Sequence, residues 1–195
     1  MQIDIKKAAA RISGQVLQTP LFYSKYLSAL NKGQVYLKLE SEQYTGSFKA
    51  RGALNKMLGL SSSEKAKGLI TASTGNHAQG FARALEIANA EGTIFLPTNA
   101  ESSKVEALKA YKVGLKFHGA DALTTELYAM KFAKASGQTW ISPYNDPDVI
   151  AGQGTLALEM TSQLASIDAV LGCIGGGGMM SGVATWLHQA SPKTK

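Results

Sequence analysis

Thr45-Gly46-Ser47-Phe48-Lys49-Ala50-Arg51-Gly52 places a single lysine between an aromatic ring and a glycine-bounded helix start. A lysine held at such a junction can be desolvated and fixed in direction. Under those conditions its amine loses its proton and can attack a carbonyl carbon. Most lysines are solvated surface residues, so Lys49 becomes a candidate catalytic residue only if the rest of the chain supplies a site around it.

Around this stretch, short apolar segments alternate with segments of helical period. The expected strands are Val35–Leu39, Leu69–Ala72, Thr93–Leu96, Leu115–Phe117, Thr139–Ile141 and Ala169–Ile174. The expected helices are Asp4–Val16, one capped by Ser47, Asn76–Ala88, one reaching Lys112 with Ser103 and Glu106 as a capping box, Ala122–Ser136, one starting within Gly152–Gln163, and Ser181–Ala190. Ser61–Ser63 is expected to be a loop. This alternation predicts an α/β fold with mainly parallel sheets, whose ligands bind at the carboxyl ends of strands.

A polar loop, Ser73-Thr74-Gly75-Asn76-His77-Ala78-Gln79, follows one of these strands. It places two hydroxyls, a side-chain amide and free backbone N–H groups at a helix start, which suits a carboxylate anion. The alternative interpretation is an elaborate helix cap, with Ser73 or Asn76 satisfying the helix. Taken singly, His77 is expected to be a hydrogen-bonded structural histidine.

Four consecutive glycines, Gly175–Gly178, lie between an apolar strand and a helix. Their N–H groups can approach and surround an anion, helped by the helix dipole. No Gly-Lys-Ser/Thr follows, and the context does not suit a dinucleotide fingerprint. The alternatives are a phosphate cradle and a flexible turn; the entropic cost of four glycines favours the cradle. Gly152-Gln153-Gly154-Thr155 is expected to be either a further helix entry at the same end of the sheet or a plain helix cap.

Composition excludes several classes of protein. The net charge of the 195 residues is +6, but the lysines are scattered, so a nucleic-acid-binding surface is not expected. No apolar run is long enough to span a bilayer, and the first residues lack a secretory pattern. The single cysteine, Cys173, is expected in the core and is consistent with the cytoplasm. His118 and His188 stand alone, so no metal site is expected.

Together these stretches resemble the fold-type II pyridoxal-phosphate enzymes, in particular the threonine/serine dehydratase and serine racemase branch. The matching stretches are TGSFKARGALNKM (45–57), STGNHAQG (73–80), AGQGTLALE (151–159) and GGGGMMSG (175–182), with Thr19-Pro20-Leu21 before them. The resemblance implies a tryptophan synthase β-like fold with two parallel-sheet domains. Residues 1–52 and 147–195 would belong to the larger, cofactor-binding domain, and residues 53–146 to a smaller inserted domain.

The resemblance also implies roles for the motifs. Lys49 would form the Schiff base with pyridoxal 5'-phosphate, Phe48 would pack beside this cofactor, and Asn76 would hydrogen-bond its ring 3′-oxygen. Backbone N–H groups would hold its phosphate, from Gly175, Gly176, Gly177, Gly178 and Met179. The substrate carboxylate would bind to the polar loop, at Ser73, Thr74, Gly75, Asn76 and His77.

The implied reaction is the dehydration and deamination of a small hydroxy-amino acid, L-threonine or L-serine, to a 2-oxo acid and ammonia. Lys49 would remove the α-proton. Dehydratases of this kind usually have alanine where Thr74 stands, and the racemases have serine. Serine racemase or hydroxyaspartate dehydratase activity is therefore an alternative. The β-replacing synthases share the fold, but His77 and the stretch from Phe48 to Gly52 favour deamination.

The family continues beyond the position of Lys195, so the larger domain is expected to be incomplete at its C-terminal side. The part that follows normally carries later strands, the hydroxyl residue that meets the pyridine nitrogen, and the cation site of racemase-like members. A truncated, catalytically silent fragment is therefore a further alternative. A homodimer is expected from the resemblance.

Overall fold

The computed structural model describes residues 3–195. The helices are α1 (Ile5–Ile12), α2 (Lys25–Asn31), the short 3-10 helix η1 (Glu40–Glu42), α3 (Lys49–Gly59), α4 (Ser62–Ala66), α5 (Asn76–Ala88), α6 (Ser102–Lys109), α7 (Ala122–Ser136), α8 (Pro147–Gln163) and α9 (Gly178–Ala190). The strands are β1 (Leu21–Tyr23), β2 (Tyr36–Lys38), β3 (Leu69–Ala72), β4 (Gly92–Leu96), β5 (Gly114–Phe117) and β6 (Thr139–Trp140).

A parallel sheet of order β5-β4-β3-β6 is covered by helices on both faces. Because side chains alternate along a strand, Ile94 and Leu96 pack with α3, α5 and α6, whereas Phe95 packs on the opposite face with α7. Both faces are thus buried, as parallel sheets require. The expectation of an α/β fold with a parallel sheet is confirmed.

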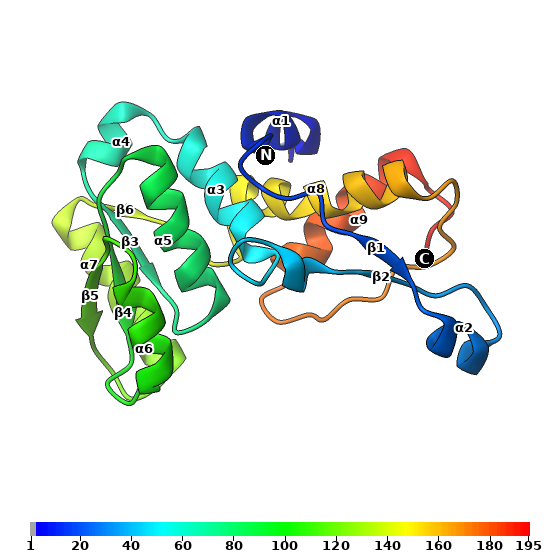
Figure 1. Ribbon diagram of the computed structural model, residues 1–195. Coiled ribbons are helices and arrows are strands. Elements are labelled where there is room, and N and C mark those ends of the chain that lie inside the picture. Colours follow the sequence, from blue (N-terminus) through cyan, green and yellow to red (C-terminus); the bar gives the residue numbers. More distant parts are fainter. Residues whose placement is uncertain (1–2) are drawn as a thin grey trace.

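The other part of the molecule consists of packed helices beside a small hairpin. In Figure 1, α8 and α9 lie to the right of the parallel sheet, with α1 above α8 and with β1 and β2 towards the right, and α3 lies between the two parts. Strands β1 and β2 are antiparallel, with Phe22 opposite Leu37. The sequence predicts two parallel-sheet domains; over residues 3–195 the parallel pairing is confined to β3–β6.

Glycines allow the helices of this part to approach closely. A Cβ added at Gly152 of α8 would lie 2.6 Å from the carbonyl oxygen of Arg51 and from the Cα of Gly52 in α3. A Cβ at Gly182 of α9 would lie 2.6 Å from the backbone nitrogen of Gly154. Real Cβ atoms do not tolerate such distances. The expectation that Gly152–Thr155 forms a helix entry or a helix cap is therefore wrong: α8 begins at Pro147 with Asp146 as its cap, and these glycines serve packing within the helix.

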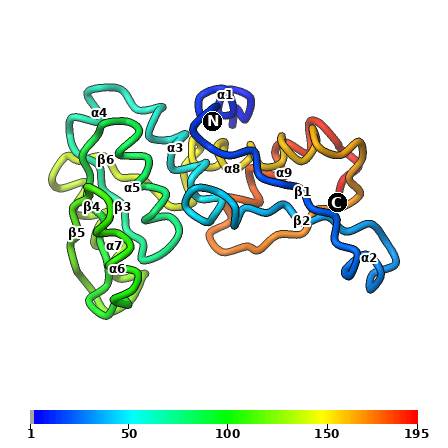
Figure 2. Tube along the Cα trace, in the orientation of Figure 1, coloured from blue at the N-terminus to red at the C-terminus, as the bar shows by residue number. Residues whose placement is uncertain are grey.

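The chain leaves this helical part and returns to it. Figure 2 follows the trace from blue through cyan into the green sheet region, and then back through yellow to red. Helix α3 packs against both α5 and α8, and the predicted change of domain after residue 52 falls inside it. Helix α8 starts at residue 147, where the predicted return begins. The division into 1–52 with 147–195 and 53–146 stays a prediction.

Helices α5 and α7 have the predicted bounds, and Gly137 ends α7 in the left-handed conformation. The expected capping box of Ser103 and Glu106 does not form. The capping box is formed by Ser61 and Glu64 at α4, where a loop is expected, whereas α6 starts at Ser102 without a side-chain cap. The first helix is also shorter than predicted, since α1 ends at Ile12.

The expected strand Ala169–Ile174 does not form, and this expectation is wrong. No strand is assigned there, and 93% of Leu171 and 74% of Ile174 are exposed. The backbone N–H of Val170 donates to the carbonyl of Lys195, at 2.9 Å, but over residues 3–195 no strand runs alongside this segment. Cys173 is exposed with it, contrary to the expected core position. Helix α9 starts at Gly178, three residues before the predicted start.

Candidate active site

A cavity of about 370 Å³ opens at the carboxyl ends of β3 and β4. Its walls come from α3, the turn after β3, the start of α5, the end of β4, the first turns of α7 and the segment after β6. Residues of both key motifs line it: Lys49, Ser73, Thr74, Asn76 and His77. The structure thus brings together a lysine and a polar loop that stand more than twenty residues apart in sequence.

Lys49 is the first residue of α3 and is half-buried. The expected cap is wrong in detail, because Phe48 occupies the N-cap position. The Ser47 hydroxyl instead accepts a hydrogen bond from the backbone N–H of Lys49, at 3.3 Å. The Lys49 amine donates to the carbonyl of Pro143 at 2.7 Å and lies 5.4 Å from the centre of the Phe48 ring.

Burial lowers the pKa of Lys49, and the opposing influence of Cys173 and Glu126 does not cancel it. The neutral amine is the nucleophilic and basic form of lysine. The setting of Lys49 therefore favours the form that can react with an aldehyde or accept a proton.

The polar loop presents an uncapped helix start to the cavity. Helix α5 begins at Asn76, its N-cap residue is Gly75, and no side chain caps it. The Ser73 hydroxyl accepts from the N–H of Gly75, at 3.2 Å, rather than from the helix. The alternative interpretation, in which a Ser73 or Asn76 side chain caps the first backbone N–H groups of the helix, is therefore wrong. Gly75 shapes the loop without lining the cavity, and the free N–H groups suit an anion.

His77 is buried, and its hydrogen bonds fix its tautomer. The Thr71 hydroxyl donates its one proton to the carbonyl of Ile141, at 2.8 Å, so it accepts from Nε2 of His77, at 3.0 Å. Nδ1 then carries a lone pair, and it has no partner among the described residues. Burial, with a smaller influence of Lys49, lowers the pKa of His77 to about 3. His77 is the structural histidine expected from the sequence, and it is neutral.

The glycine loop, Gly175–Gly178, lies beside this cavity, separated from it by Tyr144. A Cβ at Gly176 would lie 2.3 Å from the Tyr144 ring, and one at Gly178 would lie 2.5 Å from the Tyr144 carbonyl oxygen. Gly177 adopts φ 82° as the N-cap of α9, and no side chain caps this helix. A bare backbone at an uncapped helix start fits an anion. Met179 and Phe48 pack at one apolar cluster between α8 and α9.

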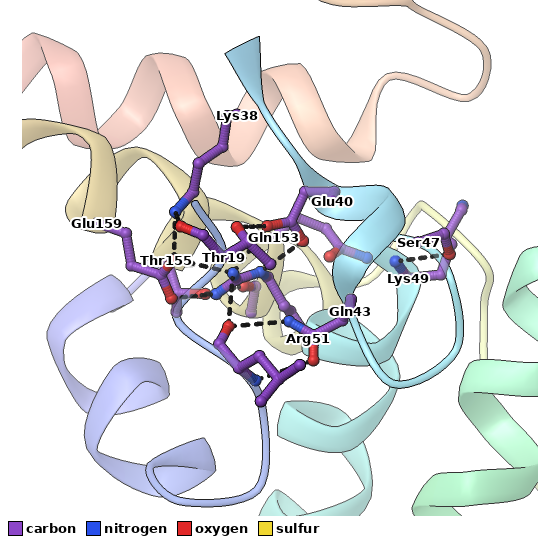
Figure 3. A network of polar contacts seen from close by, with 12 residues as sticks. Thr19, Lys38, Glu40, Gln43, Ser47, Lys49, Arg51, Gln153, Thr155 and Glu159 are labelled. Carbon is purple, nitrogen blue, oxygen red and sulfur yellow. Dashed lines mark hydrogen bonds and ion pairs between the residues drawn. The ribbon is translucent and has the colours of Figure 1, made fainter. Parts of the chain in front are cut away.

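Behind Lys49, a buried network of charges joins distant segments (Figure 3). The Arg51 side chain is 0% exposed; it donates to both carboxylate oxygens of Glu159 and of Glu40. Lys38 contacts Glu159 at 2.6 Å from the other side. The network thus fixes the first turn of α3, and Lys49 with it, to α8 and to the segment after β2.

Sequence reasoning used Arg51 only as part of the stretch that favours deamination, and it assigned no role in the site to Glu126, Pro143 or Tyr144. Arg51 and Glu159 both fall within motifs quoted above, but their pairing depends on how α3 and α8 cross. Pro143 and Tyr144 directly follow the last strand of the sheet, at its carboxyl end, which is the available signal. Over residues 3–195, no group of His, Cys, Asp and Glu is placed to hold a metal ion, and no helix could span a membrane.

A family model described as "Pyridoxal-phosphate dependent enzyme" matches residues 12–195. The chain belongs to this family. A catabolic L-threonine dehydratase of Staphylococcus aureus is 44% identical over 190 residues, which are 97% of this chain and 55% of that protein. The resemblance found in the motifs, and the cofactor it implies, are thus confirmed at the level of the family.

Solved structures extend this finding to the branch. Threonine deaminase isoform 2 of Solanum lycopersicum superposes with a TM-score of 0.93 at 38% identity, covering 98% of this chain and 53% of that one. Serine racemase of Dictyostelium discoideum gives a TM-score of 0.91 at 33% identity, covering 98% and 62%. The expected threonine/serine dehydratase and serine racemase branch is confirmed. The chain spans between 53% and 62% of the length of these relatives.

Proposed function

We propose that this protein catalyses the pyridoxal-phosphate-dependent dehydration and deamination of L-threonine or L-serine to a 2-oxo acid and ammonia. The observation that carries the proposal is one cavity shared by a desolvated lysine and an uncapped, hydroxyl-bearing helix start. The similarity to a threonine dehydratase supports the choice of reaction.

The residues present fit pyridoxal phosphate. The glycine loop has the bare backbone and the uncapped helix start that a phosphate group needs. In this proposal its N–H groups hold the phosphate, with that of Met179, while Lys49 binds the aldehyde carbon. Phe48 packs beside the ring, and Asn76 hydrogen-bonds the ring oxygen. When bound, the cofactor draws electrons away from the α-carbon of the amino acid joined to it, which makes the α-proton removable.

The chain's own groups then bind the substrate and move its proton. The N–H groups from Ser73 to His77 receive the substrate carboxylate, which points the α-carbon into the cavity. Once the substrate amine had displaced Lys49 from the aldehyde carbon, the freed Lys49 amine would accept the α-proton at Nζ. His77 is a poor base because its pKa is about 3, so Lys49 is the group suited to this step.

Racemisation is the second candidate, and the position of Thr74 supports it. Thr74 lines the cavity, where its hydroxyl could exchange a proton with the substrate face opposite Lys49. The variant Thr74→Ala should lose D-serine formation from L-serine and keep 2-oxo acid formation. Unchanged racemisation would remove Thr74 from this role.

The test of the main proposal starts with cofactor uptake. Pyridoxal phosphate should give a visible absorbance band on mixing with the protein, and L-threonine or L-serine should then yield a 2-oxo acid. Lys49→Ala should abolish the band, whereas Lys67→Ala, a lysine exposed outside the cavity, should retain it. Colour that persists in Lys49→Ala would contradict the assignment. A band without product would favour the catalytically silent fragment. The homodimer and the cytoplasmic location stay predictions.

A further inference from the structure

Glu126 brings a carboxylate into the cavity opposite the polar loop. It lies in the second turn of α7, whose start is well fixed: Asp121 caps the helix, and the hydroxyl of buried Thr125 donates to the carbonyl of His118 at 2.7 Å. Glu126 is partly buried and lines the cavity together with Lys49 and the loop residues. The proposed function gives this carboxylate no role.

A second residue of the cavity holds Glu126 in place. The Tyr144 hydroxyl donates to Oε1 of Glu126 at 2.9 Å, while the backbone of Tyr144 packs on Gly178. Oε2 has no partner within the described part of the chain, so it remains available to the contents of the cavity. Glu126 raises the pKa of the Tyr144 hydroxyl, which therefore keeps the proton that it donates.

The other walls of the cavity do not offset this negative charge. They are mainly apolar at this end: Ala72, Phe95, Pro97 and Ala122. Among the described lining residues Lys49 is the one side chain that can carry a positive charge at neutral pH; its amine donates to the Pro143 carbonyl at 2.7 Å, and burial lowers its pKa, which favours the neutral form. Lys116 is close, but it lies over the rings of Phe95 and Phe132 and does not line the cavity.

We infer that Glu126, oriented by Tyr144, determines specificity by excluding amino acids with an anionic side chain from this cavity. This inference rests on the proposed function and narrows its substrate class to neutral hydroxy-amino acids. A substrate whose α-carboxylate binds at Ser73–His77 has its side chain in the same small cavity as Glu126. A second carboxylate there meets a like charge in a partly desolvated site, whereas a hydroxyl or amide can donate to the free oxygen of Glu126. Hydroxyaspartate is thereby disfavoured.

The test compares L-asparagine with L-aspartate, which have nearly the same shape and differ in charge. Neither carries a β-hydroxyl, so binding is measured without dehydration. Titration calorimetry on protein loaded with pyridoxal phosphate should show L-aspartate binding at least about tenfold more weakly than L-asparagine. Glu126→Gln should bring the two affinities to within about threefold, because the amide removes the like charge at nearly constant shape.

Two further variants test whether the difference in affinity depends on net charge alone and whether Tyr144 contributes to it. Glu106→Gln removes an exposed carboxylate outside the cavity, so it should leave the affinity ratio unchanged. Tyr144→Phe keeps the Glu126 carboxylate but removes the hydrogen bond that orients it, so its affinity ratio should lie between those of the wild type and Glu126→Gln. Equal affinities in the wild-type protein, or an unchanged ratio in Glu126→Gln, would overturn the inference and leave the proposed function intact. Failure of the wild-type protein to take up pyridoxal phosphate would overturn both.

Discussion

Arg51 of α3 and Glu159 of α8 form two hydrogen bonds, of 2.6 Å and 2.9 Å, in the buried interior of the helical part. Arg51 makes a second pair of bonds to Glu40, each 2.8 Å long. One guanidinium therefore connects two acidic residues that are 119 positions apart in sequence. Since Arg51 stands two residues after Lys49, the position of the lysine depends on this connection.

Replacing Arg51 with Ala should strongly destabilise the fold. The change leaves the Glu40 and Glu159 carboxylates buried with Lys38 as the remaining cation, and removing one partner of a buried pair typically costs about 3–5 kcal/mol. Urea unfolding followed by circular dichroism measures the effect. Lys104→Ala is the matched control, because it breaks an exposed i,i+3 pair with Glu101 and should barely change stability. Equal losses in the two variants would contradict the role of the network.

Replacing Gly152 with Ala should push α8 away from α3. The added methyl would lie 2.6 Å from the Arg51 carbonyl oxygen, and backbone cannot yield as a flexible side chain can. Such overpacking costs about 1–3 kcal/mol, and the displacement should also weaken cofactor uptake. At Gly33 the nearest atom to an added methyl is 3.9 Å away, so Gly33→Ala is the control and should unfold like the wild type in the same urea titration. A Gly152→Ala protein with the stability of the wild type would contradict the tight packing of α8 against α3 at this position.

The elements that the sequence predicted well carry their own signal. Helix α5 has an apolar face at helical spacing and follows a polar turn, so both its bounds were predictable. Ala169–Ile174 has a strand composition, but a strand forms only with a partner, and composition cannot say whether a partner lies alongside. Gly152 resembles a helix-breaking residue in sequence, yet the close crossing of α3 and α8 gives it a place within a helix.

The same contrast holds for the site. Ser73 and Asn76 could be predicted because they directly follow a strand of the parallel sheet, at the end where ligands bind. Lys49 could be predicted because it stands between an aromatic ring and a glycine-bounded helix start. Glu126 could not, since it lies inside a regular helix and reaches the cavity only because α7 crosses the sheet there. The position of Tyr144 between the cavity and the glycine loop likewise depends on tertiary packing that no local pattern encodes.

The reactivity of Lys49 should depend on Glu126. Burial lowers the pKa of Lys49, and the negative charge of Glu126 acts against this shift. Removing that charge in Glu126→Gln should therefore lower the pKa of Lys49 further. Labelling with an amine-specific reagent at a series of pH values, read by mass spectrometry of the Lys49 peptide, should show a midpoint below 10.5 in the wild type and a lower one in the variant. A midpoint that rises in Glu126→Gln would contradict the electrostatic relation between the two residues.

His77 should make the fold sensitive to acid. The pKa of His77 is about 3 in the folded protein, because burial disfavours the charged ring, and 6.5 for an exposed histidine. Between these pH values the unfolded chain therefore binds more protons than the folded protein. The stability that neutral His77 provides is thus fully present above pH 6.5 and is lost as the pH falls toward 3, by up to about 1.4 kcal/mol per pH unit.

His77→Gln tests this dependence, because a glutamine amide can still donate to the Thr71 hydroxyl but does not titrate. Carboxylates also titrate at low pH and affect both proteins alike, so the difference between wild type and variant isolates the histidine. Urea midpoints measured from pH 7.5 to pH 4.5 should fall more steeply in the wild type than in His77→Gln. Parallel curves would mean that the protonated ring is accommodated in the folded state, and that His77 is not held neutral by burial.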